Sequence, residues 1–255
     1  MLYKEKFGTP SKGWVIVVHG LGEHSKRYQK LISMLNKEGY GVYTFDWPGH
    51  GKSHGKRGHS SVGEGIKIIQ GLIDEIGEKP FLFGHSLGAI TVIRYAEKYP
   101  DSVKGVIASS PSLVYPENVT LFNIFVVHVA GSIFPRLTAY NRLNPHELSR
   151  NKDAVQRYID DPLIHDRTSG ALTKTLFFNM KKGLEEAGLI KAPILVLNGT
   201  NDKVTPIRGA RRFIEKVKIK DKQLKEFDGA YHEIFEDPEW AETFHTIIVE
   251  WIKNH

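Results

Sequence analysis

The chain has 255 residues, of which 40% are hydrophobic and 25% charged, and its formal net charge at pH 7 is +6. These values are typical of an ordinary globular protein with one large domain, or one domain that carries an insertion. Cysteine is absent, which excludes disulfide bonds, thiolate catalysis and cysteine-ligated zinc. Because no compact arginine-rich tract occurs, we interpret the positive charge as a solvated surface and expect no nucleic-acid partner.

Neither the N-terminus nor the most apolar later segment indicates a targeting or membrane-spanning element. Residues 1–6 lack the apolar core of a signal peptide, so we expect a cytoplasmic protein. The most apolar later segment, 121–134, is interrupted by Asn123 and His128 and is shorter than the roughly 20 residues that span a bilayer. Plentiful charged residues with few methionines are compatible with a heat-adapted protein.

The first two predicted strands each lead into a turn rich in glycine. Strand 14–18 ends at His19-Gly20-Leu21-Gly22, and a helix follows over about 25–37. Strand 40–45 leads to the glycine-rich stretch 46–58 and a helix over about 61–76. This is the beginning of a regular alternation of strands and helices.

The third predicted strand, 81–83, runs directly into Gly84-His85-Ser86-Leu87-Gly88, and a helix continues over 89–96. A serine on such a sharp strand-to-helix turn is held in a strained backbone conformation that exposes its Oγ. The flanking glycines are needed because the strand and the helix pass too close for a Cβ. The G-x-S-x-G pattern alone is weak, but the strand before it and the helix after it are the context that a nucleophilic serine requires.

A fourth predicted strand, 103–108, is followed by a break in this rhythm. From about 112 to 175 we expect no strand, and the segment has helical and partly apolar character. Residues 121–122, 124–127 and 133–134 are apolar on nearly every face, so we expect them to be buried or to cover an apolar ligand. We interpret this insertion as a cap, which divides the chain into a core of 1–111 and 176–255 and a cap of 112–175.

The last two predicted strands restore the alternation. Strand 194–197 leads to the polar turn 198–206 and a helix over about 207–217. Strand 223–227 leads to Gly229-Ala230-Tyr231-His232 and a final helix over about 239–253. Continuous apolar strands that alternate with helices predict an α/β fold, in which helices flank a mostly parallel central sheet. Ligands bind at the carboxyl ends of the strands in such sheets, where the turns named above lie.

Three of these turns carry the residue types of a serine nucleophile with its base and acid. A nucleophilic serine needs a base within hydrogen-bond reach, and the base needs an acid that holds its tautomer. Ser86, Asp202 and His232 follow predicted strands in the order nucleophile, acid, base. We therefore predict that Ser86 attacks, His232 is the general base and Asp202 orients it. Asp228 is the rival acid, but it shares a turn with His232 and we expect it only to shape that loop.

Acyl transfer also needs donors aimed at the developing oxyanion, each worth roughly 3 kcal/mol. Backbone N–H groups serve well because they are fixed before the reaction. We predict the N–H of Leu87, which opens the helix after Ser86, and the N–H of Leu21 in the first turn. His19 in that turn is catalytic or structural. Because His232 already supplies the base, we interpret His19 as a residue that braces the turn.

Several longer motifs go beyond these single residues. They are 19–28 (H-G-L-G-E-H-S-K-R-Y), 46–53, 84–88, 198–204 and 229–233, with the cap segments 143–145, 148–150 and 158–165. In these segments the chain resembles the monoacylglycerol lipase and lysophospholipase branch of the α/β-hydrolases. The resemblance covers nearly the whole chain, and the G-E-H-S-x-R-Y block is much more specific than G-x-S-x-G.

The resemblance implies an α/β-hydrolase fold whose helical cap is inserted before the acid-bearing strand. It implies a serine esterase that releases a fatty acid from monoacylglycerol, a small-molecule lipid, by way of Ser86, Asp202 and His232. The cap would be mobile and would enclose a hydrophobic acyl tunnel, and no metal or organic cofactor would be required. Because few residues precede Trp14, we expect one or both opening antiparallel strands to be reduced.

Some residues of the matching motifs have two interpretations. Glu23 and Arg27 match positions near the alcohol end of the substrate, but we favour the interpretation that they pair with each other and hold the loop. Asp46, His50 and Ser53 are expected to organise a tight turn beneath the site. The candidate acyl contacts are apolar residues of the cap, namely Leu113, Leu121, Phe122, Ile124, Phe125 and Ile133. The same helix could rest transiently on a membrane surface when the cap is open.

Other functions of the same fold remain open. A lysophospholipase, a general carboxylesterase and an aminopeptidase-like amidase would use the same three catalytic residues. A lysophospholipase should need a site for a charged headgroup, and the sequence shows no clear one. A non-enzymatic lipid-binding protein with an inactive hydrolase fold predicts a missing member of the triad, yet none is missing.

Overall fold

A seven-stranded sheet forms the centre of the computed structural model, which describes residues 1–116 and 119–255, without the side chain of Leu121. The strand order is β1-β3-β2-β4-β5-β8-β9, and every neighbouring pair is parallel except β1 with β3. The strands are β1 (Lys4–Phe7), β2 (Trp14–Val18), β3 (Gly41–Phe45), β4 (Phe81–His85), β5 (Gly105–Ser109), β8 (Ile194–Gly199) and β9 (Lys222–Phe227). The predicted mostly parallel sheet is confirmed.

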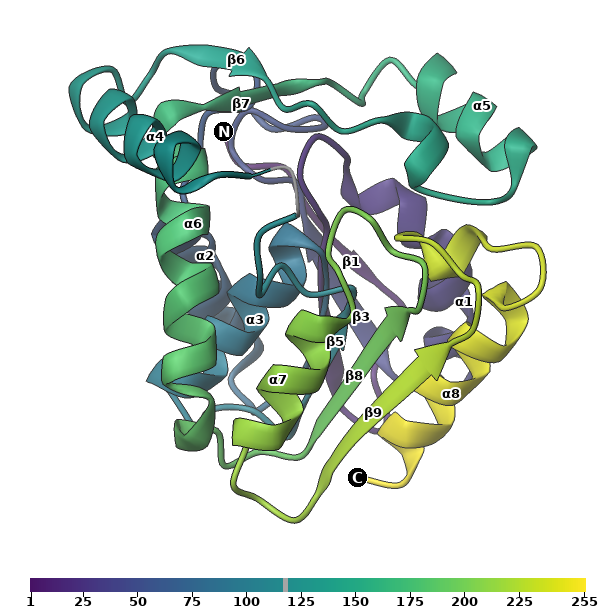
Figure 1. The fold of residues 1–255 in the computed structure, drawn as a ribbon. Coiled ribbons are helices and arrows are strands. Elements are labelled where there is room, and N and C mark those ends of the chain that lie inside the picture. The colour runs from purple at the N-terminus through teal and green to yellow at the C-terminus, as the bar shows by residue number, and fades with distance from the viewer. Residues whose placement is uncertain (117–118) are drawn as a thin grey trace.

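Helices cover both faces of this sheet (Figure 1). One face carries α1 (Gln29–Lys37) and α8 (Ala241–Lys253), and the other carries α2 (Val62–Ile76), α3 (Leu87–Lys98) and α7 (Arg208–Lys216). A further helix, α6 (Gly170–Glu185), packs against α2 and α3. Short 3₁₀ helices are η1 (Ser25–Tyr28), η2 (Pro145–Glu147), η3 (Ala187–Leu189) and η4 (Ile234–Glu236).

Alternate residues of the central strands belong to two separate hydrophobic cores. In β4, Leu82 packs into the core shared with α2 and α3, whereas Phe81 and Phe83 pack into the core shared with α1 and α8. All three side chains are buried. A strand with a core on each face is an apolar run without polar alternation, which is why these strands are recognisable in the sequence.

The N-terminal segment supplies one antiparallel strand to the sheet. Lys4 pairs with Phe45 and Phe7 with Val42, so β1 extends the edge of the sheet beyond β3. Within the described part of the chain no second strand precedes β2. The expectation that the opening strands are reduced is therefore confirmed.

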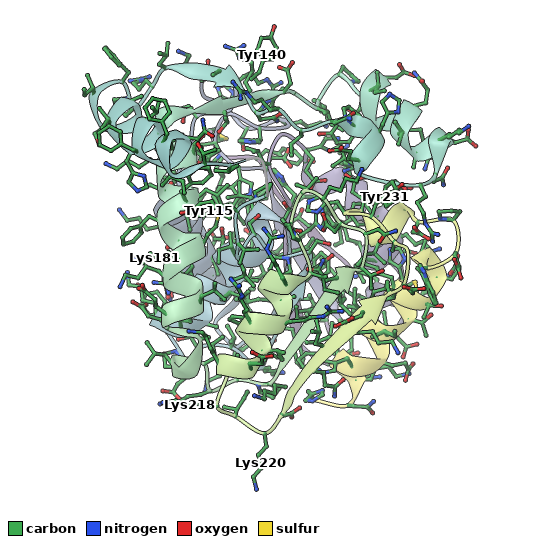
Figure 2. The ribbon with its side chains drawn as sticks, viewed as in Figure 1. Tyr115, Tyr140, Lys181, Lys218, Lys220 and Tyr231 are labelled. Carbon is green, nitrogen blue, oxygen red and sulfur yellow. The ribbon has the colours of Figure 1, made fainter. Side chains whose placement is uncertain are left out.

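The insertion between β5 and β8 lies across the carboxyl end of the sheet (Figure 1). It contains α4 (Leu121–Ile133), β6 (Thr138–Tyr140), α5 (Lys152–Asp160) and β7 (Arg167–Ser169), and then α6. Tyr140 lies at this end of the molecule, and Lys218 and Lys220 lie at the opposite end (Figure 2).

The expectation that residues 112–175 contain no strand is wrong. β6 and β7 pair antiparallel, with Thr138 opposite Ser169 and Tyr140 opposite Arg167. The Arg167 guanidinium donates a hydrogen bond of 2.7 Å to the Thr138 carbonyl and lies 4.9 Å from the centre of the Tyr140 ring. Strands of three residues are too short to show an alternating pattern, so the sequence carried no signal for them.

Helix α4 is far more exposed than its apolar sequence predicts. Phe122, Phe125 and Ile133 are 71%, 65% and 62% exposed, so the expectation of burial is wrong for them. The helix approaches α6 through Gly131, where an added Cβ would lie 2.5 Å from the Gly170 carbonyl oxygen. One close helix crossing therefore holds α4, and several apolar side chains on its outer face are exposed. None of the helices in the described residues is long and apolar enough to cross a bilayer.

Candidate active site

Ser86 lies on the turn between β4 and α3 in a strained conformation. Its φ is 54° and its ψ is −111°, a region that non-glycine residues rarely occupy. An added Cβ at Gly84 would overlap the Gly88 carbonyl, and one at Gly88 would overlap the Val18 carbonyl. Both flanking glycines are thus required by the close approach of strand and helix, as the sequence predicts.

His232 and Asp202 form a buried hydrogen-bonded pair. Asp202 follows β8 and His232 follows β9, so the adjacent strand ends bring them together. The Nδ1–H of His232 donates to Asp202 Oδ2 at 2.8 Å. Burial by itself lowers the pKa of His232, but the adjacent Asp202 charge and its hydrogen bond outweigh burial and raise that pKa above 6.5. The imidazole is therefore poised to take up a proton.

Ser86 and His232 line one small cavity, together with residues of the first turn and the cap. Its volume is about 10 Å³, which is room for about one water molecule. The other lining residues are Gly20, Leu21, Glu23, His85, Leu143, Leu148, Tyr158 and Glu233. Within the described residues Ser86 Oγ makes no hydrogen bond to His232. Such contacts are often loose without substrate and tighten in the reacting complex.

Asp228 interacts away from the imidazole. Its Oδ1 accepts a hydrogen bond of 3.2 Å from the Thr200 hydroxyl, and its carbonyl accepts one of 2.9 Å from Trp240 Nε1. It therefore shapes the loop before His232, in line with the expectation from the sequence.

His19 is a neutral, fully buried brace of the first turn. Its Nδ1–H donates to the Gly20 carbonyl at 2.8 Å, and its Nε2 accepts from the Trp47 N–H at 3.0 Å. Both ring nitrogens are thus occupied by backbone groups. Burial lowers the pKa of His19, so the ring stays neutral and the structural interpretation holds.

The turn beneath the site is organised by Asp46. Its two carboxylate oxygens accept from the N–H groups of Ser25 and Lys52, each at 2.8 Å. The Ser53 hydroxyl donates to the Asp46 carbonyl at 2.6 Å. His50 is buried beside them, with its Nδ1 at 3.1 Å from the Pro48 carbonyl. These contacts agree with the role expected for Asp46, His50 and Ser53.

The two predicted oxyanion donors both lie near Ser86. Leu21 lines the cavity with Ser86, and Leu87 is the first residue of α3. Among the residues that the structure describes, neither Leu21 N–H nor Leu87 N–H donates a hydrogen bond. The N–H of Leu87 lies at a helix N-terminus, which favours negative charge, and the N–H of Leu21 lies in the turn after β2.

Glu23 and Arg27 belong to a buried ionic network. Arg27 pairs with Glu23 at 2.9 Å and makes a two-pronged contact of 2.6 and 2.8 Å with Glu233, the residue after His232. Glu23 Oε1 accepts from the Gly20 N–H at 2.5 Å and from the Tyr28 hydroxyl at 2.7 Å. Burial acts to raise the pKa of Glu23, but the Arg27 charge, two nearby histidines and the Tyr28 hydrogen bond together outweigh it and lower that pKa to about 2. The pairing interpretation is thus observed, and Glu23 also lines the cavity.

The candidate acyl contacts have different positions in this conformation. Leu113 is buried, and Ile124 lines a second cavity of about 370 Å³ between α4 and α6. Phe122, Phe125 and Ile133 face solvent, and the side chain of Leu121 lies outside those described. The structure therefore places Ile124 against a cavity that is partly open to solvent.

Thr205 is a site residue that the sequence analysis missed. Its hydroxyl lies 2.7 Å from Asp202 Oδ2 and 3.1 Å from His232 Nδ1. The available signal was its position three residues after Asp202, because an Asp at the start of a tight turn binds the backbone two and three residues on.

No three metal-binding side chains cluster anywhere in residues 1–116 and 119–255.

A strained serine after a parallel strand, with an Asp–His pair on two further turns at the same sheet edge, defines a serine hydrolase of the α/β-hydrolase fold. The family model described as serine aminopeptidase, S33, matches residues 9–239. The chain therefore belongs to that family, and within it to the monoglyceride lipase branch.

Three similar proteins illustrate this membership. The crystal structure of the Paleococcus ferrophilus monoacylglycerol lipase is 60% identical, with a TM-score of 0.97 and 98% of both chains covered. The Homo sapiens monoglyceride lipase is 32% identical over 261 residues, which cover 99% of this chain and 86% of that protein. The Mycolicibacterium smegmatis monoacylglycerol lipase is 29% identical over 254 residues, with 97% and 90% covered.

Proposed function

We propose that the protein is a monoacylglycerol lipase that releases a free fatty acid and glycerol through an acyl-enzyme on Ser86. The observation that carries this proposal is the buried Asp202–His232 pair, which shares a cavity edge with the strained Ser86. The substrate class is supported by the relative that is 60% identical over 98% of both chains.

In the proposed mechanism His232 takes the proton of Ser86 as the hydroxyl attacks the ester carbonyl. The N–H groups of Leu21 and Leu87 donate to the oxyanion that forms. The imidazolium, stabilised by Asp202, then gives its proton to the departing glycerol oxygen. Water enters the same position, His232 activates it, and its attack on the acyl-enzyme releases the fatty acid and restores Ser86.

The alcohol end of the substrate is proposed to lie in the small cavity, where the lining carries carboxylates. Glu23 and Glu233 line it, and both are held by Arg27. Carboxylate oxygens accept hydrogen bonds from the hydroxyl groups of glycerol. Because the cavity holds about one water molecule in this conformation, glycerol binding requires the cap residues Leu143, Leu148 and Tyr158 to move.

The acyl chain is proposed to run beneath the cap to the 370 Å³ cavity. That cavity is lined by Tyr115, Ile124, His128, Phe177, Phe178, Lys181, Lys182 and Glu185. Lys181 projects from the outer side of α6 (Figure 2) and is largely exposed, so the charged residues form the rim. Each methylene that leaves water contributes about 0.8 kcal/mol, which makes the apolar part of the lining the main source of affinity.

The cap, 112–175, is proposed to touch lipid surfaces through α4. Phe122, Phe125 and Ile133 expose apolar side chains on this one helix. Apolar side chains of this kind enter the boundary between headgroups and acyl chains. The contact would bring the cap to the lipid surface that contains the substrate, while the core, 1–111 and 176–255, stays in water.

A substrate panel tests the proposed function. The panel contains a long-chain monoacylglycerol, a short nitrophenyl ester, lysophosphatidylcholine, triacylglycerol and an amino-acid amide, each with the wild type and Ser86→Ala. We expect the highest kcat/KM on the monoacylglycerol and loss of all activity in the variant. A preference for lysophosphatidylcholine or for the amide would retain the catalytic residues and reject the proposed substrate.

A further inference from the structure

The Thr205 hydroxyl lies within hydrogen-bond distance of the acid, the base and the residue that follows β5. Its Oγ1 lies 2.7 Å from Asp202 Oδ2, 3.1 Å from His232 Nδ1 and 3.1 Å from the Ser110 carbonyl oxygen. Ser110 in turn donates its hydroxyl to the His232 carbonyl at 2.7 Å. Thr205 is 3% exposed, so water does not compete for these contacts.

The Thr205 hydroxyl can donate its proton to only one of the acceptors around it. The hydroxyl has one proton, and its shortest contact is with Asp202 Oδ2. A carboxylate oxygen is also a stronger acceptor than a carbonyl oxygen. The hydroxyl therefore donates to Asp202, and its lone pairs face the Nδ1–H of His232. This arrangement requires the proton on Nδ1, which leaves the Nε2 lone pair free to accept the Ser86 proton.

We propose that Thr205 is a positioning residue that fixes the tautomer and orientation of His232 and moderates the charge of Asp202. This inference rests on the proposed serine mechanism. Thr205 does not line the cavity next to Ser86, so it acts through the base and the acid and does not touch the substrate.

Removal of this hydroxyl should shift the pH profile in one direction and lower kcat. Asp202 Oδ1 keeps its two donors, the N–H groups of Val204 and Thr205, each at 2.8 Å. Asp202 Oδ2 loses one of its two donors and carries more unshared charge, which favours the imidazolium of His232. The acid limb of the pH profile should therefore move to higher pH, by up to about one unit. An imidazole that is held less firmly should also lower kcat about tenfold and leave KM unchanged.

The test compares Thr205→Val, which removes the hydroxyl at nearly constant volume, with Thr205→Ser, which keeps it. Thr44→Val is the matched control, because Thr44 is fully buried in β3 and its hydroxyl lies 3.5 Å from the Glu5 carbonyl. The substrate is a soluble nitrophenyl ester, and kcat and KM are measured across pH. We expect the kcat loss and the shifted limb in Thr205→Val only, with Thr205→Ser close to the wild type. Proton NMR should show the downfield His232 Nδ1–H signal displaced in Thr205→Val.

Two results would overturn the inference. One is a Thr205→Val enzyme whose kcat, acid limb and imidazole signal match the wild type. The other is a loss that Thr205→Ser does not restore although it unfolds at the wild-type temperature. If Thr205→Val does not fold, Thr205→Ala against Thr205→Ser makes the same comparison. Failure of the proposed substrate is separate, because it would appear as an active wild type on the nitrophenyl ester with no monoacylglycerol turnover.

Discussion

Ser86 stores backbone strain that its neighbours must hold in place. A non-glycine residue in such a conformation costs about 1–3 kcal/mol, and packing around the turn has to offset that cost. The N–H of Ser86 donates to the Ser109 carbonyl at 2.9 Å, which ties the turn to the end of β5. The hydroxyl is thus presented at a fixed position before any substrate arrives.

Arg27 holds two carboxylates beside the site, and its loss should be felt in stability. Arg27→Met leaves Glu23 and Glu233 buried without their cation, which we expect to lower the free energy of unfolding by about 3–5 kcal/mol. Arg157→Met removes a guanidinium that is 63% exposed and pairs with Glu236, and it should cost less than about 1 kcal/mol. Urea unfolding of both variants measures the difference. Equal and small losses would show that the buried network adds nothing to stability.

At the scale of elements, the contact between β2 and α3 depends on Gly88. An added Cβ there would overlap the backbone of β2, and backbone cannot rotate away. Gly88→Ala should therefore fold poorly or lose several kcal/mol of stability. Gly71→Ala is the matched control in α2, because nothing lies within 4 Å of its added Cβ, and it should stabilise the helix by up to about 1 kcal/mol. Circular dichroism melts of both variants check this, and a Gly88→Ala protein as stable as Gly71→Ala would contradict the packing argument.

The exposed face of α4 gives a second prediction at this scale. Phe122→Ser with Phe125→Ser removes two exposed rings and leaves the core intact, because neither residue is buried. We expect weaker sedimentation with phosphatidylcholine vesicles and slower hydrolysis of vesicle-borne monoacylglycerol. Hydrolysis of a soluble nitrophenyl ester should be unchanged. An unchanged rate on vesicles would show that α4 has no part in lipid contact.

The sequence predicts the elements of the sheet well and those of the cap poorly, for a physical reason. Strands such as β4 and β8 are buried on both faces, so each is an unbroken apolar run between turns. β6 has three residues and only a partner strand to define it. Helix α4 is apolar all round, a pattern that normally indicates burial. Its exposure depends on how neighbouring elements of the fold pack against it, which the sequence of the helix does not show.

The candidate site divides in the same way. Ser86, Asp202 and His232 follow from strand ends and residue order, and the structure brings the last two within 2.8 Å. The roles of Thr205 and Glu233 could be assigned only from the structure, because a threonine or a glutamate near a motif has no single role. Arg27 also pairs with Glu233, which lies 206 positions further along the chain, and no local pattern encodes such a pairing.

For the whole molecule, buried neutral histidines predict loss of stability in acid. Burial first, with nearby charges, lowers the pKa of His85 to about 3 and those of His165 and His245 to about 4. Below pH 6.5 these histidines bind protons in the unfolded chain but stay neutral in the folded chain. The free energy of unfolding therefore falls as pH drops from about 6.5 to 4. His19 and His50 also have lowered pKa values because they are buried. His232 has a raised pKa and acts in the opposite direction, but it is one residue against five.

Urea unfolding at pH 8, 6 and 4.5 measures this loss. His165→Asn should flatten the pH dependence, because that side chain no longer takes up a proton on unfolding. His54→Asn is the matched control, since His54 is exposed and should leave the slope unchanged. A wild-type free energy of unfolding that stays constant over this range would show that the buried histidines are not held neutral.

Hydrolysis of monoacylglycerols through Ser86 can be measured as the rate of glycerol and fatty acid release from a long-chain monoacylglycerol by the wild type and Ser86→Ala. We predict equimolar release by the wild type, and a loss of at least about a thousandfold in a folded variant. Wild-type release that persists in Ser86→Ala, or no release at all, would contradict the account.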